Sequence, residues 1–194
     1  MSRVMAIKAH MSMGTYGDEL AMLAARALPH AGPSLQRETR AEQAGLHHIF
    51  LNYRREDSAG WAGRLSDYLI AELGGGSVFM DIDRIPPGED FPTAIDRALD
   101  ACVCMLVVIG PQWLSVVDQH GERRLLDKRD FVRTEVERAL SRKMRVVPVL
   151  VGGARMPAVS ELPDRMAALA RRQAFELSDR KWSADFAELV AHLR

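Results

Sequence analysis

The sequence predicts an α/β protein with a flavodoxin-like five-stranded parallel sheet, in the strand order 2-1-3-4-5, and helices on both faces. From about residue 47 onward, short apolar runs alternate five times with segments of helical hydrophobic period. The run VCMLVVIG at 103–110 is apolar on both faces, as expected for a central strand in a covered parallel sheet. Ligands bind such sheets at the carboxyl ends of the strands, so functional residues are expected there.

The first predicted elements are a strand, a helix and a second strand. The apolar run HIFLNY (48–53) predicts the first strand. Apolar residues at helical spacing predict a helix over 58–73, which the glycines at 74–76 end. The run SVFMDID (77–83) predicts the second strand.

A loop, RIPPGED (84–90), connects the second strand to the second helix. Its two prolines stiffen it, and Gly88 supplies a turn residue. Asp90 is expected to cap the N-terminus of a helix over 91–101, in which Pro92 is tolerated because it falls in the first turn.

The remaining elements continue the alternation of helices and strands. After a polar stretch at 111–129, a helix is predicted within 127–144, and RVVPVLV (145–151) predicts the fourth strand. A loop, a short helix, a weak edge strand and an amphipathic helix follow at 152–163, 164–171, 173–177 and 183–193.

The helix within 127–144 carries one acidic residue on its apolar face. At about 100° per residue, the apolar half-circle contains Phe131, Val132, Val136, Ala139 and Leu140. Glu135 lies inside this arc, about 40° from Phe131. The solvated side holds Asp130, Arg133, Glu137, Arg138 and Ser141. From the wheel alone, Glu135 either reaches solvent from the edge of the arc, pairs with an arginine, or has a function.

The composition excludes several classes of protein. The 26 Lys and Arg residues equal the 26 Asp and Glu residues, so bulk charge recruits neither nucleic acid nor a membrane surface. No apolar run reaches the ~20 residues that span a bilayer, and no secretory signal is evident, so we expect a cytoplasmic protein. Cys102 and Cys104 are interpreted as small hydrophobic residues of a strand.

The usual motifs of several enzyme classes are missing from the sequence. It contains no phosphate-binding loop, no G-x-G-x-x-G, no G-x-S-x-G and no Cys/His metal spacing. A response-regulator receiver would need acidic residues after the first strand, where Arg54 and Arg55 stand instead, and an Asp after the third. We therefore expect no cofactor and no metal.

Residues 1–46 differ from the rest and are predicted to form a weakly ordered N-terminal extension with a short helix. Its second half is a polar linker rich in Gly and Pro. The regular pattern starts near His48, so the folded domain is expected at 47–194.

Charged and aromatic residues gather where the predicted strands end, and these are the candidate site residues. Arg54 and Arg55 follow the first strand, Asp81, Asp83 and Arg84 end the second and enter the loop, Trp113 follows the third, and Glu135 lies on the helix beyond. Each also has a simpler interpretation. The arginines could pair with Glu56 or Asp57, the aspartates could form a solvated turn, with a Mg²⁺ site a weaker alternative, and Trp113 could be a packing anchor.

These residues also carry a resemblance to a known family. IFLNYRRED resembles the first conserved box of TIR (Toll/interleukin-1 receptor/resistance-protein) domains, in the form common among bacteria. VFMDIDRIPPGEDF resembles their second strand and BB loop, DFVRTEVERAL their glutamate-bearing helix, and RVVPVLVGGARMP the next strand and loop. Two positions depart from the family pattern: Phe131 replaces the usual Trp of Trp-x-x-x-Glu, and Asn52 replaces a Ser.

The resemblance implies an NAD⁺ glycohydrolase that cleaves the nicotinamide–ribose bond, giving ADP-ribose or a cyclic ADP-ribose in bacterial immune signalling or host interaction. Glu135 then corresponds to the catalytic glutamate. Nicotinamide leaves NAD⁺ as a neutral molecule and needs no proton, so one carboxylate suffices to stabilise the oxocarbenium-like ribose. The substrate-binding candidates are Arg54, Arg55, Asp81, Arg84, Trp113 and Phe131, with the arginines on the pyrophosphate and Phe131 beside the nicotinamide.

A second functional class stays open, that of a non-catalytic scaffold. TIR domains also act as protein–protein interaction modules, and in either class the resemblance implies self-association with other TIR domains through the loop 83–90. Glu135 separates the two interpretations, because only the enzyme needs its carboxylate.

Overall fold

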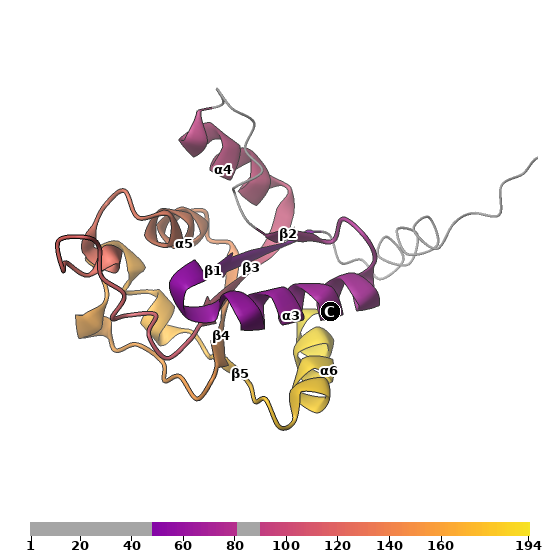
Figure 1. The fold of residues 1–194 in the computed structure, drawn as a ribbon. Helices are drawn as coiled ribbons and strands as arrows, with labels where there is room; N and C mark the ends of the chain where they lie inside the picture. The colour runs from indigo at the N-terminus through magenta and orange to yellow at the C-terminus, as the bar shows by residue number, and fades with distance from the viewer. Residues whose placement is uncertain (1–47, 81–89) are drawn as a thin grey trace, which may run out of the picture. The chain divides into compact units, whose positions relative to one another are not determined.

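The computed structural model describes residues 48–80 and 90–194, and its centre is a five-stranded sheet (Figure 1). The strands are β1 (His48–Tyr53), β2 (Val78–Met80), β3 (Cys102–Ile109), β4 (Arg145–Val151) and β5 (Phe175–Leu177). All neighbouring strands are parallel, in the order β2-β1-β3-β4-β5. The predicted fold class and strand order are confirmed. The predictions for residues 1–46 and for most of the loop 83–90 lie outside the described residues.

Helices cover both faces of the sheet, as predicted (Figure 1). On one face, α3 (Arg55–Leu73) and α6 (Trp182–Leu193) contribute to one apolar core. On the other face, α4 (Phe91–Asp100) and α5 (Phe131–Ser141) contribute to a second core. Alternate residues at the centres of β1 and β3 belong to different cores, which is why Ile49–Leu51 and Cys104–Ile109 are continuous apolar runs.

The element boundaries agree with the sequence pattern in most places. Asp90 accepts a hydrogen bond from the Thr93 backbone N–H at 3.1 Å, which confirms the predicted cap of α4. Helix α3 begins at Arg55, three residues before the predicted start at Ser58. Ser58 itself departs from helical geometry, with φ −128° and ψ 17°. The uninterrupted helix therefore begins close to the predicted residue.

One predicted helix, 164–171, is wrong in type. The structure has two 3₁₀ turns there, η4 (Asp164–Met166) and η5 (Leu169–Arg171). Met166 and Leu169 are fully buried, so the short segment follows the shape of the core instead of continuing an α-helix.

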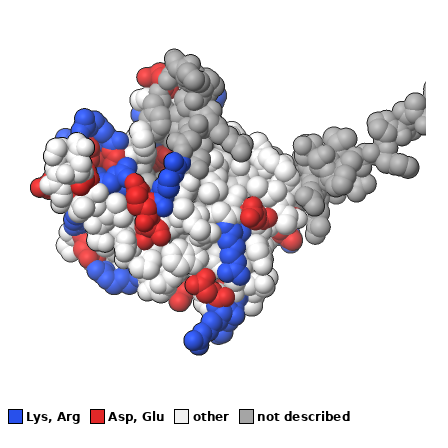
Figure 2. All heavy atoms as spheres, viewed as in Figure 1, with Lys and Arg blue, Asp and Glu red and all other residues white. Residues whose placement is uncertain are grey.

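Acidic and basic side chains lie beside one another on the face drawn in Figure 2. Within residues 48–80 and 90–194, the longest apolar stretches of helix fall short of what a bilayer crossing requires.

The end of β3 approaches the first turn of α3 closely, at Gly110. The Asp57 carboxylate accepts hydrogen bonds from the backbone N–H groups of Gly110, at 2.9 Å, and Gln112, at 2.7 Å. A Cβ atom at position 110 would lie 2.5 Å from Asp57 Oδ2. Glycine is therefore required where the sheet meets the loop that leads to α5.

Gly110→Ala is expected to lower the free energy of unfolding by about 1–3 kcal/mol, because the new methyl group displaces the Asp57 carboxylate from both amides. Chemical denaturation measures the loss. The matched control is Gly63→Ala in α3, where a Cβ meets nothing within 4 Å. This control should stabilise the protein by roughly 0.5–1 kcal/mol. Equal effects of the two substitutions would contradict the role given to Gly110.

Candidate functional site

Helix α5 presents Glu135 to the sheet from inside an apolar face. Val132, Val136 and Ala139 of this helix are buried against the second core, as the helical wheel predicts. Glu135 is buried among them, with 8% of its surface exposed. The carboxylate noticed in the sequence therefore does not extend into solvent, and the simplest of its alternative interpretations is excluded.

The rest of the wheel needs two corrections. Phe131, predicted on the apolar face, is 53% exposed, and Arg133, predicted on the solvated side, is 9% exposed. The buried arc of α5 therefore includes Arg133 and excludes Phe131, which lies in the first turn of the helix. Arg133 tolerates burial because its Nε donates to Glu137 at 2.7 Å and its Nη1 to the Leu126 carbonyl at 2.7 Å.

A side chain from β1 binds Glu135 directly. Asn52 donates from Nδ2 to Glu135 Oε2 at 2.7 Å, and more weakly to the Val132 carbonyl at 3.3 Å. Asn52 is the second-to-last residue of β1 and is 1% exposed. Glu135 is therefore anchored at the carboxyl end of β1, the edge of the sheet where ligands are expected.

Arg54, which directly follows β1, binds the start of the same helix. Its Nη1 and Nη2 each donate to one oxygen of the Asp130 carboxylate, both at 3.0 Å. Asp130 also caps α5 by accepting from the Arg133 backbone N–H at 2.9 Å. The Arg54 guanidinium is buried and paired with Asp130, so in this structure it holds the start of α5, and its contact with a ligand stays a prediction.

The neighbouring charged residues of α3 have separate partners. Arg55 is exposed at the first position of α3 and is the arginine of the pair that a ligand can reach. Glu56 forms an ion pair with Arg124, and Asp57 holds the backbone after β3. One alternative from the sequence paired the arginines with Glu56 or Asp57. In the structure, Arg54, Glu56 and Asp57 instead contact three different segments, at Asp130, Arg124 and Gly110.

Trp113 is a packing residue in this structure. Only 1% of its surface is exposed, and it belongs to the core on the α4 and α5 face. This agrees with the simpler interpretation of Trp113 from the sequence, and stacking of its ring on a ligand would need the core to open.

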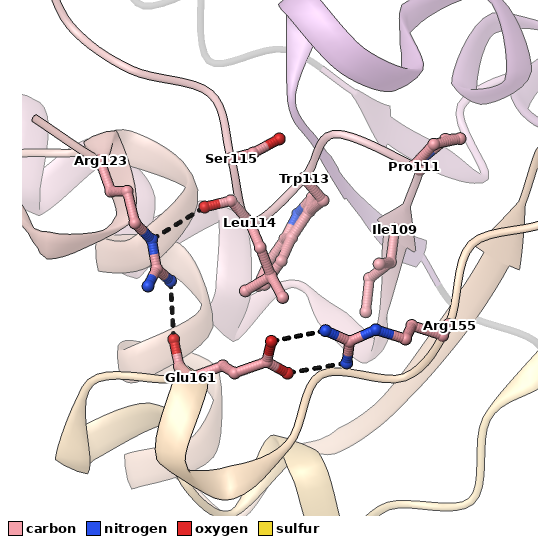
Figure 3. Close-up of a pocket in the computed structure, with 9 residues that line it drawn as sticks. Ile109, Pro111, Trp113, Leu114, Ser115, Arg123, Arg155 and Glu161 are labelled. Carbon is pink, nitrogen blue, oxygen red and sulfur yellow. Dashed lines mark hydrogen bonds and ion pairs between the residues drawn. The ribbon is translucent and has the colours of Figure 1, made fainter. Parts of the chain in front are cut away.

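Trp113 also lines a pocket of about 340 Å³ near the ends of β3 and β4 (Figure 3). Arg155 donates two hydrogen bonds to the Glu161 carboxylate, at 2.8 and 2.5 Å, and lowers the pKa of Glu161 to about 2. Arg123 donates to the carbonyls of Leu114 and Glu161. These charged groups satisfy one another across the pocket wall, and Glu135 does not line it, so this pocket is not the candidate site.

The loop candidates Asp81, Asp83 and Arg84 lie outside the described residues, so their placement relative to Glu135 is still a prediction. The Mg²⁺ alternative at Asp81 and Asp83 has the same standing. Within the described parts of the chain, no group of three or more His, Cys, Asp or Glu side chains is arranged to hold a metal ion.

Comparison with protein families decides the relationship that the motifs indicated. Residues 49–190 match a family model described as TIR domain. The chain belongs to the TIR domain family. The matched residues include all five strands and the four helices α3 to α6 for most of their length.

Relatives of this TIR domain include a named enzyme and two solved structures. NAD(+) hydrolase sarm1 of Drosophila melanogaster is 26% identical over 149 residues, which are 76% of this chain but only 10% of that protein. The TIR domains of the activated Roq1 resistosome match with a TM-score of 0.55 at 15% identity, covering 76% of this chain and 99% of that one. The TIR domain of the Toll-related receptor TRR-2 from Hydra magnipapillata matches with a TM-score of 0.52 at 16% identity, covering 76% and 98%.

Two residues at the site were missing from the candidates chosen from the TIR domain's sequence, Asn52 and Asp130. Asn52 had a visible signal, because it is a polar residue within the apolar run of a strand and shares a face with Arg54. Asp130 was placed on the solvated side of its helix, although it is 5% exposed. Its partner Arg54 is 76 residues away in the sequence, so no local pattern connects the two.

Arg54→Ala is expected to lower the free energy of unfolding by about 3–5 kcal/mol, because Asp130 would stay buried without its guanidinium partner. Denaturant titration measures the change. The matched control is Arg129→Ala, whose side chain is 91% exposed in its ion pair with Asp127, and which should change stability by less than about 1 kcal/mol. A comparable loss in both variants would show that the Arg54–Asp130 pair contributes no more to the free energy of unfolding than an exposed ion pair does.

Proposed function

We propose that this TIR domain hydrolyses NAD⁺ at the nicotinamide–ribose bond, with Glu135 as the catalytic carboxylate. The observation that carries the proposal is a glutamate that is 8% exposed, bound by Asn52 at the carboxyl end of β1. A carboxylate buried between Val132, Val136 and Ala139 is costly for folding, and buried titratable groups are enriched at functional sites. The relative named NAD(+) hydrolase sarm1 supports the same reaction class.

The proposed reaction needs one negative charge and one water molecule. The bond between ribose C1′ and the pyridinium nitrogen breaks, and its electron pair stays with nicotinamide, which leaves neutral. The ribose becomes an oxocarbenium ion, which the Glu135 carboxylate stabilises in a site of low dielectric constant. Water then attacks C1′ and loses a proton, so the products are nicotinamide, ADP-ribose and H⁺. Attack by an adenine nitrogen in place of water gives a cyclic product.

The other residues receive supporting roles in this proposal. Arg55 contacts the pyrophosphate from the exposed start of α3, and the exposed ring of Phe131, one turn before Glu135, packs against nicotinamide. Asp81 and Arg84 contribute from the loop, while Trp113 supports the wall of the site from the core. NAD⁺ is the substrate, and no bound cofactor is required.

Self-association is part of the proposal, through the loop 83–90 and in the context of bacterial immune signalling or host interaction. A non-catalytic scaffold is the second candidate function. It is favoured by two exposed apolar side chains near the start of α5, Leu126 at 52% and Phe131 at 53%, which suit a contact between proteins. The scaffold has no use for the buried charge of Glu135.

Incubation of the concentrated protein with NAD⁺ is expected to release nicotinamide, measured by chromatography with mass identification of the second product. Glu135→Gln keeps the side chain's shape but removes its charge, and should lower the rate at least ~100-fold. The matched control, Glu188→Gln, changes an exposed glutamate of α6 and should leave the rate unchanged.

Absence of nicotinamide release by the wild-type protein, at concentrations where it self-associates, would favour the scaffold. A Glu135→Gln variant as fast as the wild type would remove Glu135 from the mechanism. Circular dichroism of each variant establishes that the fold is retained.

A further inference from the structure

Asn52 is an unexpected residue for its position. Asn52 lies in β1, a strand that pairs with β2 on one side and β3 on the other. The residue is 1% exposed. Burial of an amide side chain is unfavourable unless its polar atoms find partners. Its Nδ2 has two acceptors, whereas Oδ1 has no hydrogen-bond partner in the structure as described. A leucine of similar size would avoid this cost, so the packing of β1 does not explain an asparagine.

The contacts of Asn52 fix the orientation of its amide. Nδ2 lies between two acceptors, Glu135 Oε2 at 2.7 Å and the Val132 carbonyl at 3.3 Å. Rotation of the amide by 180° would place Oδ1 against both oxygens, where all three atoms are acceptors and repel one another. Only the NH₂ group can therefore face α5, and the partnerless Oδ1 is the consequence of this arrangement.

We propose that Asn52 is a positioning residue that holds the Glu135 carboxylate in its ionised form and in a fixed direction. This inference rests on the proposed function of Glu135 and extends it to a residue of β1. The NH₂ group can only donate a hydrogen bond, and it donates more strongly to a carboxylate than to a carboxylic acid. With Oε2 fixed by Asn52 and the backbone fixed by α5, the carboxylate has one orientation before any substrate arrives.

The two arginines nearest to this contact along the chain bind other carboxylates. Directly after β1, Arg54 is paired with Asp130, and on α5, Arg133 is paired with Glu137. These pairs balance their own charges.

The test compares two substitutions of similar size, Asn52→Leu and Asn52→Asp, by their rate of nicotinamide release from NAD⁺ between pH 4 and pH 9. Asn52→Leu is expected to lower kcat about 10- to 100-fold with little change in KM, and to move the acid limb of the pH profile to higher pH. Asn52→Asp faces Glu135 with a second carboxylate, so its activity should recover toward acid pH, where a shared proton restores the donor.

A residue that only packs would lower kcat equally at every pH, and that result in both variants would overturn the proposal. The matched control is Gln119→Leu, which changes an exposed amide to leucine and should leave the pH profile unchanged. Thermal unfolding of every variant separates loss of fold from loss of function.

A double-mutant cycle makes this inference independent of the NAD⁺ reaction. Asn52→Leu should lower the unfolding midpoint in the wild-type background, but not in a Glu135→Leu background, where both partners are apolar. If the wild-type protein does not cleave NAD⁺, the proposed function fails. The double-mutant cycle still tests whether Asn52 and Glu135 interact. Additive effects would then overturn the positioning role, and a strong departure from additivity would support it.

Discussion

Polar contacts between β1 and α5 determine where the Glu135 carboxylate lies. Arg54 binds Asp130 at the N-terminus of the helix, and Asn52 binds Glu135 about one turn further along. Both side chains point to the same face, because Arg54 continues the extended backbone of β1 and side chains two positions apart on an extended chain do so. The contacts of Val132, Val136 and Ala139 with the core are apolar and non-directional, and alone they would tolerate small shifts of the helix along the sheet. The hydrogen bonds remove that freedom.

The pocket beside Arg155 and the surroundings of Glu135 differ in how their charged groups are bound. Around the pocket lined by Arg123, Arg155 and Glu161, opposite charges and backbone carbonyls satisfy one another, as expected for loops that are held in place. At Glu135, β1 contributes the neutral amide of Asn52 as a donor. In the proposed reaction, a carboxylate held by a neutral donor is suited to stabilise a developing cation.

The fold could be predicted from the sequence because hydrophobic period is a local property. Each strand lies within or next to its predicted range, and Asp90 was recognised as a cap from its position before a proline-containing helix. The errors occurred where tertiary contacts outweighed local pattern. Arg133 is buried because carbonyls of the preceding segment accept its hydrogen bonds, and Phe131 is exposed because the buried arc of α5 is rotated by about 30° away from it.

The candidate site was predictable only in part, for the same reason. A carboxylate within an apolar stripe is visible on a helical wheel, so Glu135 could be singled out. The partners of buried polar groups are not visible in this way, since Asn52 and Glu135 are 83 residues apart. Arg54 illustrates the difficulty: its position after a strand suggested a ligand contact, whereas its burial and its bidentate pair with Asp130 show a structural role.

The most direct measurement is NMR chemical-shift mapping with the two products of the proposed reaction, nicotinamide and ADP-ribose. The side-chain amide of Asn52 is a suitable probe, because the protein contains no other asparagine and its Nδ2 contacts the reacting carboxylate. Saturable shifts of the Asn52 amide and of the α5 backbone around Glu135 are expected, with α6 unaffected. Shifts confined to the pocket beside Arg155, or no shifts at millimolar product, would contradict a ligand site at the carboxyl end of β1.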